Sequence, residues 1–138
     1  MIEAISGIVT AVVIIILSQV LSRYFTTKLY AATILVAIAF IYVGFSLKDN
    51  PVSLIIVEIV FALALYTLAI VGYTRNSLLI AYGIILHGLW DIVHHNRFLI
   101  GTDIPGYWPS FCFIIDIIDG LYFLIVFKKG KALSHLIK

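Results

Sequence analysis

The sequence predicts an all-α membrane protein, a single bundle of five transmembrane helices. Of its 138 residues, 63% are hydrophobic and 12% are charged, whereas charged residues make up about 25% of a typical soluble protein. The apolar residues fall in continuous runs and do not alternate with polar ones, a pattern that favours helices over strands. A helix also satisfies its own backbone hydrogen bonds in lipid.

Five apolar segments approach the length of about 20 residues that a helix needs to cross the hydrocarbon core. They cover residues 5–22, 30–47, 53–73, 77–95 and 108–127. Turn-forming stretches separate them, such as Lys48-Asp-Asn-Pro51 and the longer connection from 96 to 107 with Gly101 and Pro105. We therefore predict one compact transmembrane domain over residues 1–138. Because Glu3 and no basic residue precedes the first segment, we expect that segment to be a retained span and not a cleaved signal.

The distribution of basic residues predicts the orientation of the bundle. With the N-terminus outside, seven Lys and Arg residues lie on the inner side and two, Lys48 and Arg97, lie on the outer side. This arrangement obeys the positive-inside rule and predicts that the C-terminus is cytoplasmic. The bilayer is the main expected partner. The balance of 9 basic and 7 acidic side chains gives no reason to expect nucleic-acid binding.

Ionisable residues are concentrated in the fourth and fifth predicted spans. His87, Asp91 and His94 are spaced to share one helix face, with His95 at its edge, and Asp116 and Asp119 share a face of the next helix. Such groups are costly at membrane depth, so we expect them to meet in one polar site. Counting about 1.5 Å per residue from the outer helix ends places His87, Asp116 and Glu58 at one level, roughly 10 to 12 Å deep.

Imidazoles and carboxylates together predict a divalent metal site, because this mixture binds zinc, iron(II) or manganese. A divalent ion would also neutralise two carboxylates that otherwise repel each other. The predicted ligands are His87, Asp91, His94, His95 and Asp116, the predicted acid–base groups are Asp91, Asp116 and Glu58, and Asp119, Tyr42, Trp90 and Arg97 are expected around the site or against a substrate.

Several of these residues also have simpler interpretations. His94 and His95 could lie at the membrane interface without a ligand role, and His87 and Asp91 could hydrogen-bond each other to hold the bundle together. Structural roles are equally open for the acidic groups Asp119 and Glu58, and for Trp90 as a packing residue.

The motif His87-Gly-Leu-Trp-Asp-Ile-Val-His-His95, followed by Trp108-Pro-Ser-Phe-Cys-Phe-Ile-Ile-Asp116, resembles a family of small uncharacterised prokaryotic membrane proteins. In that family an HGxWDxxHH segment precedes a segment in which Tyr often stands where this chain has Trp108. The resemblance covers about the last third of the chain. It implies that the histidines and aspartates act as one unit, but it supplies no reaction. The pattern is also loosely similar to the histidine-rich sites of membrane lipid hydrolases and hydroxylases, with too few histidines for the di-iron hydroxylases and no evident counterpart of the ceramidase-type serine.

The favoured functional hypothesis is a metal-dependent enzyme acting on a lipid or another hydrophobic small molecule. Hydrolysis is preferred over oxygenation because hydrolysis needs no redox metal. Alternatives are a proton- or ion-coupled transporter, a metal-free lipid isomerase and a structural membrane subunit, since buried His and carboxylate groups also serve proton relays. The inner halves of the predicted spans are nearly free of charge, so a conduction path would need a homo-oligomer interface.

Overall fold

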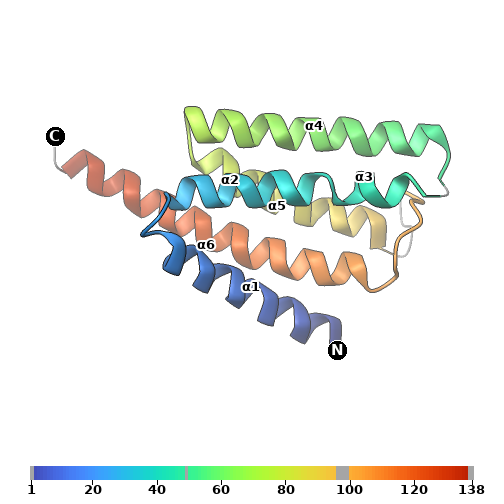
Figure 1. The fold of residues 1–138 in the computed structure, drawn as a ribbon, viewed down its shortest axis with the longest axis horizontal. Coiled ribbons are helices and arrows are strands. Elements are labelled where there is room, and N and C mark those ends of the chain that lie inside the picture. The colour runs from blue at the N-terminus through green and yellow to red at the C-terminus, as the bar shows by residue number, and fades with distance from the viewer. Residues whose placement is uncertain (1, 49, 96–99, 137–138) are drawn as a thin grey trace.

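The protein is an all-α bundle, as the sequence predicts. The structure is a computed structural model that describes residues 2–48, 50–95 and 100–136, without the side chains of 131–136. Its helices are α1 (Ile2–Leu21), α2 (Thr27–Ala39), α3 (Ile41–Ser46), α4 (Val52–Thr74), α5 (Leu78–His94) and α6 (Trp108–Leu136). They run side by side along the long axis of the molecule (Figure 1).

Four of the five predicted spans are confirmed as helices long and apolar enough to cross a membrane. These are α1, the combined segment Thr27–Ser46, α4 and the Trp108–Gly130 part of α6. The fifth predicted span, 77–95, is the apolar helix α5 of 17 residues. This length stands at the lower limit for a crossing helix, so its full crossing of the bilayer stays a prediction.

The predicted second span is interrupted at Phe40, which separates α2 from α3. Neither Pro nor Gly stands at the break, and the sequence gives no sign of it. At the start of this span, the Thr26 side chain accepts a hydrogen bond from the backbone N–H of Leu29 and caps α2. The short helix α3 then carries Tyr42 into the interior of the bundle, where this side chain is 2% exposed.

Helix α5 lies at the centre of the bundle, in contact with α2, α4 and α6. Small residues let it approach its neighbours closely. A Cβ atom at Gly88 would lie 3.1 Å from Cβ of Asp116, and a Cβ at Gly120 would lie 2.5 Å from Cγ1 of Ile85. Glycines at helix contacts are typical of membrane bundles, because close backbones gain packing where lipid supplies no hydrophobic drive. Here they bring α5 and α6 together at the depth of His87.

The buried interior changes from apolar to polar along the bundle. One half holds the hydrophobic core, formed by Ala31, Ala32, Leu35, Ala39, Ala62, Leu65, Ala69, Ile80, Ala81, Ile84, Phe123 and Phe127. Further along the same helices, the buried positions become polar, with Tyr42, Glu58, His87, Asp91, His94, Asp116 and Asp119. The site residues on α4, α5 and α6 are therefore each carried by a helix whose buried face also contributes to the apolar core.

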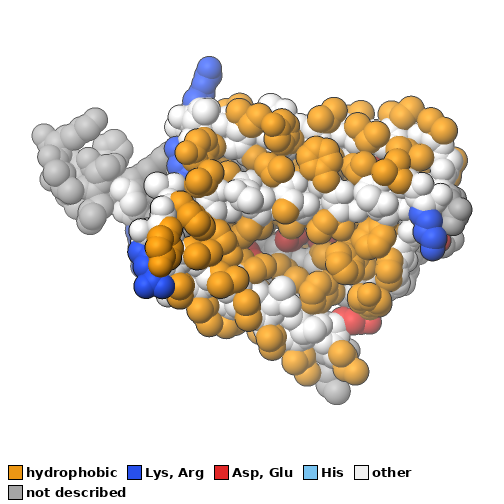
Figure 2. Space-filling model, in the orientation of Figure 1, with side chains coloured by type: hydrophobic (Ala, Val, Ile, Leu, Met, Phe, Trp, Pro, Cys, Tyr) orange, Lys and Arg blue, Asp and Glu red, His pale blue; other side chains and the backbone are white. Residues whose placement is uncertain are grey.

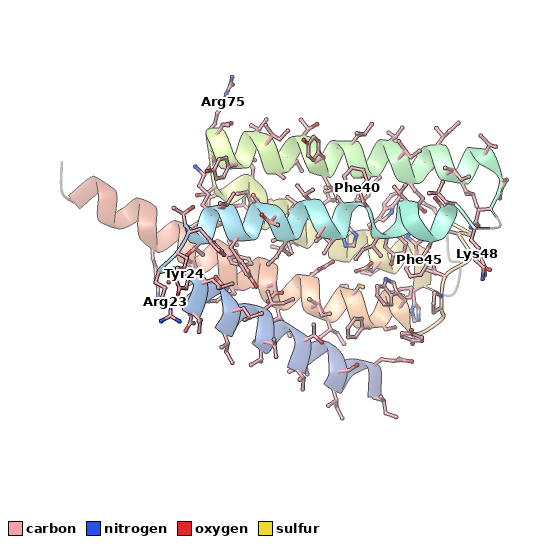
Figure 3. The ribbon with its side chains drawn as sticks, in the orientation of Figure 1. Arg23, Tyr24, Phe40, Phe45, Lys48 and Arg75 are labelled. Atoms are coloured by element: carbon pink, nitrogen blue, oxygen red, sulfur yellow. The ribbon has the colours of Figure 1, made fainter. Side chains whose placement is uncertain are left out.

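The two ends of the bundle differ in charge. Arg23 and Arg75 lie at the end next to the apolar core, and Lys48 lies at the opposite end, beside the polar half (Figure 3). Between the two ends, the visible surface is largely apolar, and Asp or Glu atoms appear at the floor of a hollow in its middle (Figure 2). By the positive-inside rule we predict that the Lys48 end faces outwards.

Candidate metal centre

His87, Asp91 and Asp116 form a compact buried group at the contact between α5 and α6. Each offers one ligand atom, and these atoms all lie within 4.8 Å of one another. His87 Nδ1 lies 2.6 Å from Asp116 Oδ2 and 4.0 Å from Asp91 Oδ2. All three residues are at most 2% exposed. The prediction that His87 and Asp116 lie at one depth is thus confirmed, and the three residues are called the HDD group below.

Tyr42 from α3 holds the HDD group from the other side. Its hydroxyl donates a 2.6 Å hydrogen bond to Asp91 Oδ1, and both side chains are buried. Its ring lies 5.7 Å from the His87 ring, centroid to centroid. The bond fixes one oxygen of the Asp91 carboxyl, and the buried Oδ2 has no hydrogen-bond partner among the described residues. The predicted place of Tyr42 near the site is therefore supported by direct contact.

Glu58 lies in a second cluster nearer the Lys48 end, away from the predicted level of His87 and Asp116. Its Oε1 lies 2.7 Å from His94 Nε2 and accepts a 2.7 Å hydrogen bond from the Thr102 hydroxyl. Its Oε2 accepts a 3.2 Å hydrogen bond from the indole N–H of Trp90. These four residues, the Glu58 cluster, join α4 and α5 to the connection that follows α5.

Hydrogen-bond counting indicates that Glu58 and His94 share one proton. His94 Nδ1 lies 3.0 Å from the Trp90 carbonyl oxygen, which can only accept, so Nδ1 carries a hydrogen. Nε2 then faces the Glu58 carboxyl at 2.7 Å. Either His94 is the imidazolium beside a carboxylate, or Glu58 is the carboxylic acid donating to a neutral ring. In both states the pair carries no net charge, which lowers the cost of burying it.

His94 and His95 lie apart from the HDD group, although the sequence predicts them as ligands of the same ion. The reason is the helix rise, because the seven residues from His87 to His94 span about 10.5 Å along the axis. Two ligands of one ion lie much closer, since each stands roughly 2.1 Å from it. His94 instead bonds Glu58, and the exposed His95 places Nδ1 3.2 Å from Ser110 Oγ.

The remaining predicted residues have different positions. Trp90 bonds Glu58 and stacks on Phe61 with ring centroids 3.9 Å apart, so it belongs to the Glu58 cluster. Asp119, one turn from Asp116 towards the apolar core, is 1% exposed, and neither of its carboxylate oxygens has a hydrogen-bond partner in the described chain. Arg97 lies outside the described residues.

The Glu58 cluster and the HDD group are linked through Tyr42. The Tyr42 ring stacks on the His94 ring at a centroid distance of 4.2 Å and an interplanar angle of 17°. A displacement of His94 would therefore shift the hydroxyl that holds Asp91. Stacking of this kind is worth about 0.5 to 1.5 kcal/mol beyond the area it buries.

The HDD group has the chemistry of a divalent metal site. One imidazole and two carboxylates bind zinc, iron(II) or manganese, and three protein ligands leave a coordination position open. Asp91 Oδ2 is a buried acceptor without a donor in the part of the chain that the structure describes, and a cation would satisfy it. The distance of 2.6 Å between His87 Nδ1 and Asp116 Oδ2 is that of a hydrogen bond. Ligands of a tetrahedral ion lie roughly 3.4 Å apart, so both side chains would have to separate slightly to hold one.

A cleft of about 570 Å³ lies between α5 and α6. Its walls come from the last turns of α5 and the first turns of α6, with Ile92, Phe113 and Ile114 among the apolar members. Asp91 is also part of the wall, so the same residue belongs to the HDD group and to the cleft. His95 and Ser110 line the cleft as well.

Thr102 and Ser110 are polar residues of this region that the sequence analysis does not predict. Thr102 is 1% exposed although it lies in a connection, and its contact with Glu58 spans 44 positions of the chain. Nothing in its sequence context distinguishes it from an ordinary loop threonine. Ser110 lies next to Pro109 in the first turn of α6. Its proximity to the histidine segment could have indicated that it lies near the site.

Comparison with known proteins places the chain in a family. No curated protein and no solved structure matches the chain. A family model described as a family of unknown function, DUF6010, matches residues 2–130. This match includes all of α1 to α5 and the part of α6 that carries both aspartates. The chain belongs to this family of unknown function, DUF6010.

Proposed function

We propose that the protein is a metal-dependent membrane enzyme that hydrolyses a lipid or a similar hydrophobic substrate. One observation carries the proposal. Asp91 belongs both to a buried group that can hold a divalent ion and to the wall of a 570 Å³ cleft between two membrane helices. Ligand sites are usually concave and largely apolar, with a few converging polar groups, and cavities of about 300 to 1,000 Å³ are typical.

His87, Asp91 and Asp116 would hold the ion. When bound, a divalent ion supplies Lewis acidity, which polarises a carbonyl group and makes water a nucleophile at neutral pH. Tyr42 keeps Asp91 in place through its 2.6 Å hydrogen bond. Contacts of this kind orient ligands and typically change metal affinity by about 10- to 100-fold. Asp91 also lines the cleft, so an ion that it holds would lie close to a substrate bound there.

The cleft would give the substrate access to this group from the side of the bilayer. Its apolar walls suit a hydrocarbon chain, and its position at the Lys48 end would confine the reaction to one leaflet. The apolar core fills the other half of the interior, which separates the site from the basic end of the bundle. This arrangement favours a reaction within one leaflet over conduction from one side to the other.

The experiment is a hydrolysis assay on the protein reconstituted in vesicles that contain ester- and amide-linked lipids. We expect release of fatty acid that a chelator abolishes and that added zinc, iron(II) or manganese restores. His87→Ala and Asp116→Ala should remove the activity, whereas His135→Ala in the C-terminal segment should leave it unchanged. Hydrolysis that survives both chelation and His87→Ala would overturn the proposal.

The second candidate is a metal-free lipid isomerase, favoured by the 2.6 Å contact between His87 Nδ1 and Asp116 Oδ2. Without a metal ion, the imidazole and the carboxyl form an acid–base pair that can move a proton between two positions of an unsaturated chain. Conversion of an unsaturated lipid that is unaffected by chelation, and lost in His87→Ala, would select this alternative.

A further inference from the structure

We infer that the cleft between α5 and α6 binds the acyl chain of an ester-linked glycerophospholipid, with the ester at the level of His95 and Ser110. The inference rests on the proposed function for the reaction, which would require the bound ester to move about 6 Å inwards, to the level of Asp91. The binding itself requires only the cleft. It gives His95 a role in binding substrate in place of the metal-ligand role predicted from the sequence.

The first support is the depth of the cleft in the bundle. His95 follows the last residue of α5, and Ser110 lies in the first turn of α6, so both stand at helix ends. Asp91 and Ile114 lie four residues further in, about 6 Å deeper along their helices. Helix ends mark the boundary between headgroups and hydrocarbon, where the ester linkages of a glycerophospholipid lie.

The second support is a pair of polar side chains at the outer end of the cleft, with mostly apolar side chains below them and Asp91 at the inner end. His95 and Ser110 line its outer part, and their side chains lie 3.2 Å apart. In one histidine tautomer the Ser110 hydroxyl donates to Nδ1 and the ring keeps its Nε2–H. In the other tautomer Nδ1–H donates to Ser110 and the serine keeps its O–H. Both states therefore leave one donor for an ester carbonyl, while Ile92, Phe113 and Ile114 are apolar.

The third support is an apolar path below the cleft. Ile114, Leu121 and Ile125 are seven and four positions apart on α6 and share one helix face. Leu121 is 48% exposed and Ile125 is 54% exposed. A chain that begins in the cleft can therefore continue along α6 towards the bilayer centre without leaving an apolar surface. A polar or charged small molecule would gain nothing from this path.

The test uses a glycerophospholipid with a photoreactive group in one acyl chain, present at a low mole fraction in detergent micelles that hold the full-length protein. After illumination, the labelled residues are mapped by mass spectrometry. We expect saturable labelling of the cleft residues from 109 to 114. A photoreactive hydrocarbon of the same chain length in a parallel experiment should label them much less, because it has no carbonyl group to accept the hydrogen bond.

Two tryptophan variants provide a matched comparison. Ile92 lines the cleft and is 47% exposed, whereas Leu89 is 48% exposed on the same helix and is not among the lining residues. Ile92→Trp should reduce the labelling about tenfold, the change expected when roughly two methylene groups lose their burial. Leu89→Trp should leave it unchanged, and the double substitution of His95→Ala and Ser110→Ala should weaken labelling by the phospholipid alone.

The outcomes separate this inference from the proposed function. Labelling spread evenly over the lipid-facing helices, equal labelling by the hydrocarbon, or equal effects of both tryptophan variants would overturn the inference. Cleft labelling that persists in His87→Ala, with no hydrolysis by the wild-type protein, would support the inference and remove the proposed function. Chelator-sensitive hydrolysis that Ile92→Trp does not change would support the proposed function and overturn the inference.

Discussion

The hydrogen bond from Tyr42 to Asp91 allows a sharp test of how the site is held, through the substitution Tyr42→Phe. The phenyl ring can keep the stack on His94, whose centroid distance is 4.2 Å, so only the hydroxyl is lost. Asp91 Oδ1 would then be a buried acceptor with no donor, at a position that is 0% exposed. Hydrogen bonds to charged groups contribute about 1.5 to 3 kcal/mol in soluble proteins, and those between membrane helices average about 0.6 with a maximum near 1.7.

We therefore expect Tyr42→Phe to destabilise the fold by about 1 kcal/mol and to weaken metal binding about 10- to 100-fold. Unfolding can be followed with a thiol-reactive fluorescent dye, because Cys112 is the one cysteine of the chain and is buried. Metal affinity is measured by titration calorimetry. Tyr82→Phe, at a ring that is 48% exposed, is the control. If Tyr42→Phe matches this control in both measurements, the hydroxyl does not position Asp91.

Three further substitutions test the surroundings of the site by the same dye assay. Gly88→Ala places a Cβ 3.1 Å from Cβ of Asp116 and should destabilise the protein by about 1 to 3 kcal/mol. Its control is Gly44→Ala, which has nothing within 4 Å of its Cβ and should leave the stability unchanged. Equal unfolding temperatures of the two variants would contradict the close packing. Thr102→Val removes a hydroxyl that donates to Glu58, so it should cost about 1 kcal/mol and speed proteolysis after α5; unchanged cleavage would show that this contact does not hold the connection. Asp119→Asn replaces a buried carboxyl with no hydrogen-bond partner in the described chain and should raise the unfolding temperature, and a lower temperature would mean that Asp119 has a stabilising partner in the folded protein.

The sequence predicts the helices well because their signal is local. Each apolar run continues for the length of a helix and ends at a turn-forming segment. At most of the helix ends, the predicted and the observed boundaries therefore differ by only a few residues. The interruption at Phe40 is different, since no local residue causes it. It depends on how α2 and α3 pack against the rest of the bundle, which one sequence does not reveal.

The site is partly predictable for a related reason. Depth follows from counting residues, so the meeting of His87 and Asp116 could be predicted from the sequence. The same count places Glu58 at this depth, but its carboxyl bonds His94 and Thr102 nearer the Lys48 end. A helical side chain leans towards the N-terminus of its helix, and α4 begins at that end (Figure 1). The same count of residues could have predicted the separation of His94 from His87, because a shared helix face does not bring residues two turns apart to one ion.

Elemental analysis of the purified protein tests the central claim most directly, because the account requires that His87, Asp91 and Asp116 hold a divalent metal ion. We expect about one equivalent of zinc, iron or manganese per chain in the wild-type protein, lost in His87→Ala and in Asp116→Ala and retained in His95→Ala. A folded wild-type protein that contains no divalent metal, and binds none when zinc, iron(II) or manganese is supplied, would contradict the account.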